Sequence, residues 1–147
     1  MHRDQIPIDV ETARRLIAEQ FPQFRDERIE RLGVLGTDNA VFGIGSRAAA
    51  RFPLRFGDRG ECADRLCREA AAMAEFAGCS PVPSPRPIGL GRPGPGYPMP
   101  WSVQTWVEGE VATPDGLAGA RSFARDIAEL VAALRRADTR GRHQLGD

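Results

Sequence analysis

The sequence predicts an α+β fold, an antiparallel sheet with a flanking helix that is followed by a separate amphipathic helix. Three observations favour it: short strand patterns alternate with polar turns, two long segments have helical periodicity, and residues 101–107 alternate apolar and polar side chains. Gly109 ends this last strand, and a strand that runs through a turn into a long helix can be a hinge between two lobes. We therefore expect one lobe at residues 1–108, and the hinge exit with the start of an incomplete helical lobe at 109–147.

The composition is that of a soluble globular protein. The 147 residues are 41% hydrophobic and 27% charged, and 20 basic residues balance 20 acidic ones, which argues against nucleic acid or an anionic membrane as a partner. Every basic residue is Arg, so a fixed positive charge in any site must be a guanidinium. Three cysteines without metal-ligand spacing and two remote histidines predict no metal site. The N-terminus has no apolar core of signal-peptide length, and we expect a cytoplasmic protein.

The first half of the chain begins with a helix and continues as three strands. Asp9 can cap a helix that runs to about Gln20, and Pro22 follows its end. Strand patterns come next at residues 29–35, 40–44 and 48–53. The turns between these strands contain Gly, Asp, Asn and Ser, which favour tight turns, so a meander of three antiparallel strands is expected.

A second helix is predicted from about Glu61 to Ala77, ended by Gly78. Glu69 lies three residues after Leu66, on the stripe that should be buried, where an unpaired carboxylate would cost several kcal/mol. Arg51, on the strand that should pack under this helix, is a candidate partner. The alternative is that Glu69 lies at the edge of the stripe and reaches water, and the spacing alone leaves both readings open.

A connector rich in proline joins this part to the end of the chain. Eight of the 12 prolines lie at residues 81–100, which excludes a helix and leaves room for a short strand at about 87–90. Residues 89–94 spell the dinucleotide fingerprint GxGxxG, but that motif must open a helix, so we reject it. Thr113 and Pro114 then begin a helix with a strong apolar stripe, formed by Phe123, Ile127, Leu130, Val131 and Leu134.

The turn between the first two strands could bind phosphate. Residues 36–39 read Gly-Thr-Asp-Asn, and such a turn can offer backbone N–H groups and short polar side chains to an anion. A polar hairpin turn is more often only a turn, so this motif by itself is a weak signal.

Together these segments resemble the aminoglycoside phosphotransferase family, whose members share the protein-kinase-like fold. The matching blocks run in the same order over nearly the whole chain: IDVETARRLIAEQFPQF, LGTDNAVFGIG, AARFP, CREAAAM, PVPSPRPIGLGRPGPGYPMPW and SVQTWVEGE. The last two blocks are long and unusual, which argues against chance similarity. The resemblance implies a protein-kinase-like N-terminal lobe plus the first helix of a truncated C-terminal lobe.

The resemblance also implies a nucleotide site and a reaction. The residues implied to bind the nucleotide are Gly36, Thr37, Asp38, Asn39, Arg51, Glu69, Thr105 and Val107. The first four would form the loop over the phosphates, Arg51 would replace the phosphate-binding lysine with Glu69 as its ion-pair partner, and backbone groups of the last two would face the purine. The cofactor would be ATP or GTP with Mg, and the acceptor a hydroxyl of an aminoglycoside-like antibiotic or another metabolite, as in antibiotic resistance.

The sequence departs from the family beyond the hinge. Such enzymes need a catalytic-loop Asp, and an Asn and a second Asp for the metal ions, all after the helix that here ends near Asp138. None is recognisable before Asp147, so the resemblance implies no catalytic residue and no Mg ligand in this chain, and an acceptor only if the missing lobe is supplied. Two alternatives stay open: a non-catalytic kinase-like binding module, with possible self-association through helix 118–137, or a decayed gene fragment.

Overall fold

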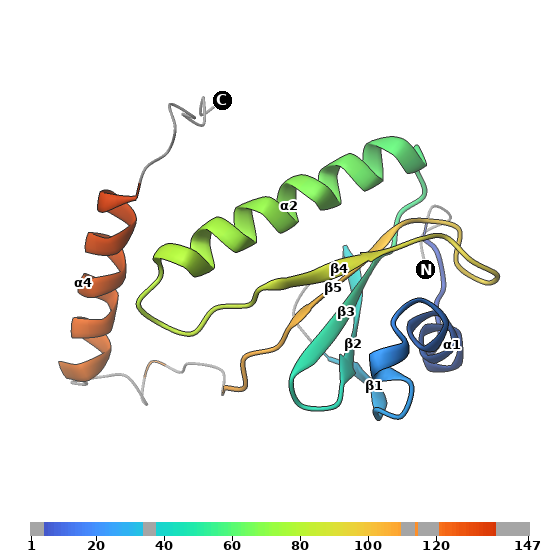
Figure 1. The fold of residues 1–147 in the computed structure, drawn as a ribbon, viewed down its shortest axis with the longest axis horizontal. Coiled ribbons are helices and arrows are strands. Elements are labelled where there is room, and N and C mark those ends of the chain that lie inside the picture. The colour runs from blue at the N-terminus through green and yellow to red at the C-terminus, as the bar shows by residue number, and fades with distance from the viewer. Residues whose placement is uncertain (1–4, 34–37, 110–113, 115–120, 138–147) are drawn as a thin grey trace.

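The computed structural model describes residues 5–33, 38–109, 114 and 121–137. These residues form a five-stranded antiparallel sheet with strand order β1-β2-β3-β5-β4. Figure 1 shows α2 lying across one side of the sheet and α1 on the other side. The strands are β1 Ile29–Leu32, β2 Asn39–Ile44, β3 Ala48–Pro53, β4 Pro87–Gly91 and β5 Trp101–Thr105. The helices are α1 Val10–Gln20, the 3-10 turn η1 Pro22–Phe24, α2 Arg59–Cys79 and α4 Arg121–Arg136. The predicted α+β fold is confirmed.

Two strands end earlier than the sequence predicted. β1 stops at Leu32, because Gly33 follows and glycine is a poor strand former. β5 stops at Thr105, because Thr105 already pairs with Ala48, the first residue of β3, and the ladder has no further partner strand.

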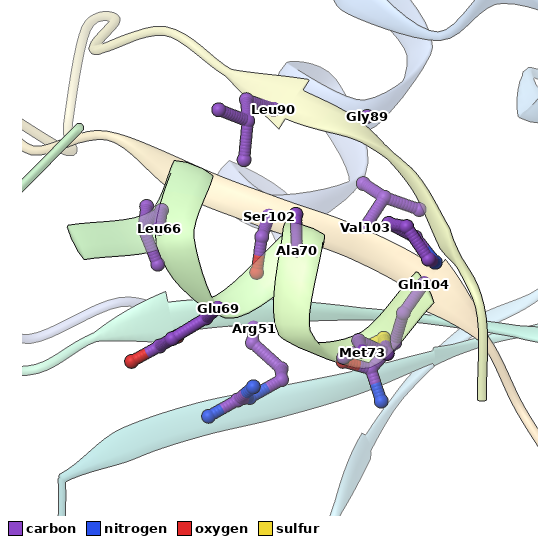
Figure 2. Close-up of a pocket in the computed structure, with 11 residues that line it drawn as sticks. Arg51, Leu66, Glu69, Ala70, Met73, Gly89, Leu90, Ser102, Val103 and Gln104 are labelled. Carbon is purple, nitrogen blue, oxygen red and sulfur yellow. The ribbon is translucent and has the colours of Figure 1, made fainter. Parts of the chain in front are cut away.

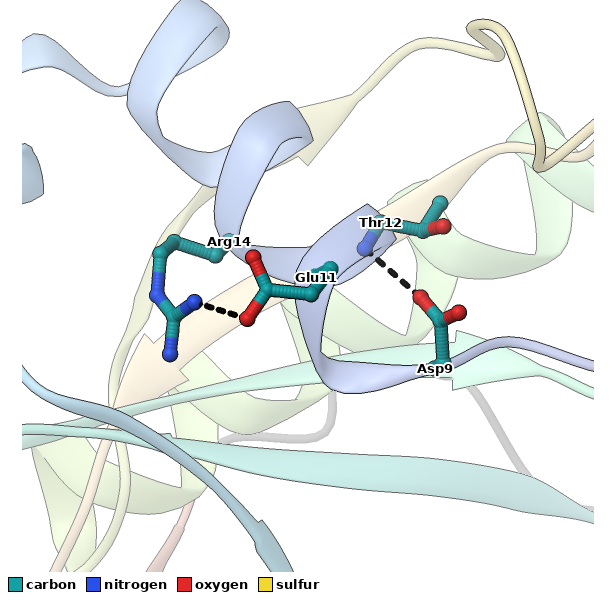
Figure 3. Close-up of polar contacts among 4 residues, drawn as sticks. All are labelled: Asp9, Glu11, Thr12 and Arg14. Carbon is teal, nitrogen blue, oxygen red and sulfur yellow. Dashed lines mark hydrogen bonds and ion pairs between the residues drawn. The ribbon is translucent and has the colours of Figure 1, made fainter.

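The start of α1 follows the prediction (Figure 3). The Asp9 carboxylate accepts a hydrogen bond of 2.8 Å from the Thr12 backbone N–H, and Glu11 forms an ion pair with Arg14 one turn further on. The same Thr12 hydrogen bond holds the pKa of Asp9 below its usual value. The helix thus begins with a satisfied cap and buries its inner side chains, Ala13, Leu16 and Ile17, against the sheet.

The two faces of the sheet differ in chemistry. The face toward α1 carries the apolar core, in which Trp101 stacks on Phe52 at 4.7 Å between ring centroids and meets Phe21 edge-on. Tyr97 is also buried there and donates its hydroxyl hydrogen bond to the Pro53 carbonyl. Tyr97 and Trp101 are therefore core residues. The opposite face of the sheet carries Arg51, which pairs in register with Ser102. Helix α2 lies across this second face (Figure 1).

Helix α2 is longer than predicted at both ends. Asp58 caps it by accepting a 2.9 Å hydrogen bond from the Glu61 backbone N–H, so the helix begins at Arg59. Gly78 does not end it as predicted, because the Ser80 N–H still reaches the Phe76 carbonyl before Pro81 stops the helix. The buried residues of this helix are only Cys62, Leu66 and Ala77.

Helix α4 lies apart from the sheet, near the end of α2 (Figure 1). Its apolar stripe has the predicted spacing, and the side chains of Phe123, Ile127, Val131 and Leu134 are 40–45% exposed. The predicted cap, Thr113, lies outside the described residues. Within the described part of the chain, no helix is long and apolar enough to span a membrane.

The three cysteines differ in exposure, which predicts a thiol-labelling pattern. Cys62 is buried and burial raises the pKa of its thiol, whereas Cys67 lies exposed on the same helix. Since the thiolate is the reactive species, Cys67 should react with Ellman's reagent at pH 8 at least about tenfold faster than Cys62. Single-cysteine variants followed at 412 nm check this. Equal rates in the native chain would contradict the packing described here, and urea should remove the difference.

Candidate functional site

A polar pocket opens between α2 and the sheet face that carries Arg51. Its volume is about 460 Å³. The strand pairing places Arg51 on this face, because it lies opposite Ser102 while the neighbouring side chains of β3 point to the core. The pocket is lined by Asp38, Asn39, Arg51, Pro53, Arg55, Arg65, Leu66 and Glu69.

A narrow apolar slot continues this pocket beneath α2 (Figure 2). It shares Arg51, Leu66 and Glu69 with the polar pocket and is closed by Met73 and by Gln104 on β5. The slot has about 10 Å³ of free space, roughly that of one water molecule, so it is too small for a purine ring. Figure 2 shows the Arg51 and Glu69 side chains extending in the same direction out of the slot. Polar ligand chemistry therefore belongs to the wider pocket.

Of the two readings that the sequence left open for Glu69, the structure shows the one in which the side chain reaches solvent. Its side chain is 43% exposed, and it forms an ion pair of 3.9 Å with Arg65, one helical turn before it. The reason is that α2 contacts a sheet face of mixed polarity through only a few side chains, so the position of Glu69 on the helix reaches solvent. Glu69 and Arg51 line one pocket, but among the described residues no ion pair joins them, and their pairing stays a prediction.

The described part of the predicted phosphate loop reaches the same pocket. Asp38 and Asn39 line it, and the Asp38 carboxylate lies 3.9 Å from the Arg55 guanidinium. The Asp38 carbonyl accepts a 2.9 Å hydrogen bond from the Leu54 N–H, which ties the start of β2 to the end of β3. Gly36 and Thr37 lie outside the described residues.

The predicted hinge lies at the C-terminal end of β5. The Thr105 N–H donates to the Arg86 carbonyl, its hydroxyl accepts from the Arg86 N–H, and the Trp106 N–H donates to the Arg47 carbonyl, each at 2.8 Å. Within the described chain, the Val107 N–H donates no hydrogen bond and its side chain is 40% exposed. Neither Thr105 nor Val107 lines the two pockets, so their contact with a purine stays a prediction.

Three pocket residues were not predicted from the sequence. Arg55 lies four residues after Arg51, on the same side of the extended chain, and Arg65 lies one helical turn before Glu69. Each of these two arginines lies four residues from a predicted site residue, and this spacing was the sequence signal that could have identified them. Gln104 belongs to the predicted strand at residues 101–107, and its side chain in the slot was not considered.

Among the described residues, Gln104 Oε1 is the one buried side-chain oxygen or nitrogen without a hydrogen-bond partner. This oxygen is shielded from solvent and accepts no hydrogen bond. Gln104→Leu, which keeps the volume and removes that atom, should therefore raise the free energy of unfolding by about 1 kcal/mol. Urea denaturation followed by circular dichroism measures this. A loss of stability of similar size would show that the amide contributes to the apo fold.

The described residues contain no group of three or more His, Cys, Asp or Glu side chains placed to hold a metal ion. This part of the chain therefore offers no metal cage built from protein ligands alone, and no chemical step is assigned to a metal ion.

An antiparallel sheet with a helix across its polar face, and an arginine-lined pocket between them, have the architecture of the N-terminal lobe of the protein-kinase-like fold. The model of the phosphotransferase enzyme family, APH, matches residues 13–147, and the chain belongs to this family. The resemblance seen in the sequence is thereby confirmed. No curated protein is similar enough to count as a match.

Solved structures of aminoglycoside phosphotransferases share this fold. The GDP and kanamycin complex of APH(2″)-IIIa is 24% identical with a TM-score of 0.66, and covers 90% of this chain and 43% of that chain. The GDP complex of wild-type aminoglycoside 2′-phosphotransferase-IIIa is 24% identical with a TM-score of 0.67, and the match covers 90% of this chain and 44% of that chain. A GDP complex of a point mutant of that protein is 25% identical with a TM-score of 0.63, and the match covers 86% of this chain and 41% of that chain. The chain spans less than half the length of these proteins.

Proposed function

We propose that this chain is the nucleotide-binding portion of an ATP- or GTP-dependent phosphotransferase that acts on a hydroxyl of a small molecule. The observation that carries the proposal is the pocket in which Asp38, Asn39, Arg51 and Glu69 come together from β2, β3 and α2. Members of the family transfer phosphoryl groups, and the structural relatives were solved with GDP. The protein is proposed to be cytoplasmic, which suits its three free cysteines.

Within this portion, the residues have binding and positioning roles. Arg51 would hold the phosphates, the loop at 36–39 would cover them, and the hinge at 104–107 would offer backbone groups to the purine. Phosphoryl transfer depends on positioning and on stabilising charge, and it also needs a residue that orients the acceptor hydroxyl. We assign no such residue among the 147, so we infer that this chain binds nucleotide and transfers no phosphoryl group by itself. The acceptor, an aminoglycoside or another hydroxyl compound, would require further residues.

The test is nucleotide binding together with a phosphotransfer assay on the chain. Isothermal titration with GDP, GTP, ADP and ATP should give binding at micromolar to millimolar concentration to at least one of them. Incubation with kanamycin and the γ-labelled triphosphate should give no labelled product. Turnover by the native chain that persists in Arg51→Ala would refute the assigned roles, and the absence of binding by all four nucleotides would refute the proposal.

A second candidate is a non-catalytic module that self-associates through α4. The observation that favours it is the stripe of four apolar side chains on α4, each at least 40% exposed. Exposed apolar surface of this kind is often a protein–protein contact. Size-exclusion chromatography with light scattering at several concentrations would reveal a dimer. A monomer that binds no hydrophobic dye would exclude this function.

A further inference from the structure

The polar pocket contains two arginines to which the nucleotide-binding assignment gives no role. Arg55 follows β3, and Arg65 lies on α2, so together with Arg51 they surround the pocket from the strand side and the helix side. The two carboxylates of the lining, Asp38 and Glu69, are fewer than the three guanidinium groups. Three positive and two negative charges leave the lining with a net charge of +1.

Among the described residues, each of these two arginines has only a loose carboxylate partner. Arg55 Nη2 lies 3.9 Å from Asp38 Oδ1, and Arg65 Nε lies 3.9 Å from Glu69 Oε1. Hydrogen bonds between opposite charges are roughly 1 Å shorter than this. The arginine side chains are 77% and 53% exposed, and exposed pairs of such geometry add little stability. Arg65 also makes a weak contact of 3.6 Å to the sulfur of Cys62. Both guanidinium groups can therefore exchange their present partners for a stronger anion.

We propose that Arg55 and Arg65 join Arg51 in binding the polyphosphate of a nucleoside di- or triphosphate. This inference rests on the proposed function and names further residues of the same site. A guanidinium group can donate two parallel hydrogen bonds to a phosphate, and three such groups suit a ligand with several charged phosphates better than a single carboxylate. The chain has no lysine, so arginine is the only side chain that could supply these charges at neutral pH.

The experiment compares Arg55→Gln, Arg65→Gln and the double variant with the native chain. GDP binding, with ADP in parallel, is measured by isothermal titration, and inorganic tripolyphosphate is used as a competitor. Each single change should weaken the binding of the nucleoside diphosphates about fivefold, and the double change about twentyfold. The effects are moderate because both side chains are partly exposed and solvent screens their charges. Tripolyphosphate should displace the nucleotide from the double variant only at about tenfold higher concentration, and 0.5 M salt should reduce all these differences.

Arg68→Gln is the matched control. Arg68 is exposed on α2, the helix that carries Arg65, and it does not line the pocket. The substitution removes one positive charge, as the two test substitutions do. The affinity of this variant should stay within twofold of the native value, and circular dichroism should show that all variants are folded. If the native chain binds neither GDP nor ADP, the proposed function fails and this assignment with it. If it binds them and the double variant binds within twofold of native, or Arg68→Gln weakens binding as much, only the arginine assignment fails.

Discussion

Gly91→Ala should destabilise the fold by about 3 kcal/mol or more. A Cβ at this position would lie 1.9 Å from Trp101 Cε2 and within 2.4 Å of two other indole atoms. The indole cannot move away, because it is fully buried, stacks on Phe52 and donates a 3.0 Å hydrogen bond from Nε1 to the Arg92 carbonyl. Overpacking a rigid core site of this kind costs roughly 1–3 kcal/mol and occasionally more. The urea midpoint of the far-ultraviolet circular dichroism signal measures the loss.

Two further variants separate this clash from the general effect of replacing glycine. Gly78→Ala is the matched control, because a Cβ there meets nothing within 4 Å and the residue is helical, so stability should rise by about 0.5 kcal/mol. In a Trp101→Leu background, Gly91→Ala should cost much less than in the native chain, because the indole atoms are gone. Equal costs in the two backgrounds would show that the Trp101 contact is not the cause.

The pattern of β5 was readable from the sequence because burial alternates along a strand. Trp101 and Val103 are buried in the core, while Ser102 and Gln104, which alternate with them, face α2. The requirement for glycine at position 91 was not readable. It arises because Gly91 and Trp101 are opposite each other across β4 and β5, and a strand register is a tertiary property.

The candidate site was only partly predictable for a related reason. A helical pattern tells which side of α2 is apolar, but not where that side meets a sheet face that is itself polar. The pattern therefore left open whether Glu69 is buried or exposed, and its side chain is 43% exposed. Asp38, Asn39 and Arg51 were predicted together through the family resemblance, and they do line one pocket. Arg55 and Arg65 could not be assigned to the pocket from the sequence, because their place in it depends on the pairing of β3 with β5 and on the position of α2 above the sheet.

Arg51→Ala should weaken nucleotide binding about 100-fold, the largest functional effect that we expect from one substitution. Arg51 lies in the middle of β3, paired with Val41 on one side and Ser102 on the other, so its Cα is held firmly. It lines both pockets, and among the described residues no carboxylate forms an ion pair with it. Two hydrogen bonds from a guanidinium to a phosphate contribute about 3 kcal/mol, and 1.4 kcal/mol corresponds to a factor of ten in affinity. Titration of GDP and ADP into both proteins measures the change.

The stability of the same variant distinguishes a binding role from a structural one. Because no described residue forms an ion pair with the Arg51 side chain, Arg51→Ala should change the free energy of unfolding by less than about 0.5 kcal/mol. Arg51→Lys keeps the charge but loses the planar pair of donors, and should bind about tenfold more weakly than native. An Arg51→Ala protein that is folded and binds within threefold of native would contradict a phosphate-binding role for this arginine. A lysine variant as weak as the alanine variant would instead show that bidentate geometry, and not charge alone, accounts for the binding.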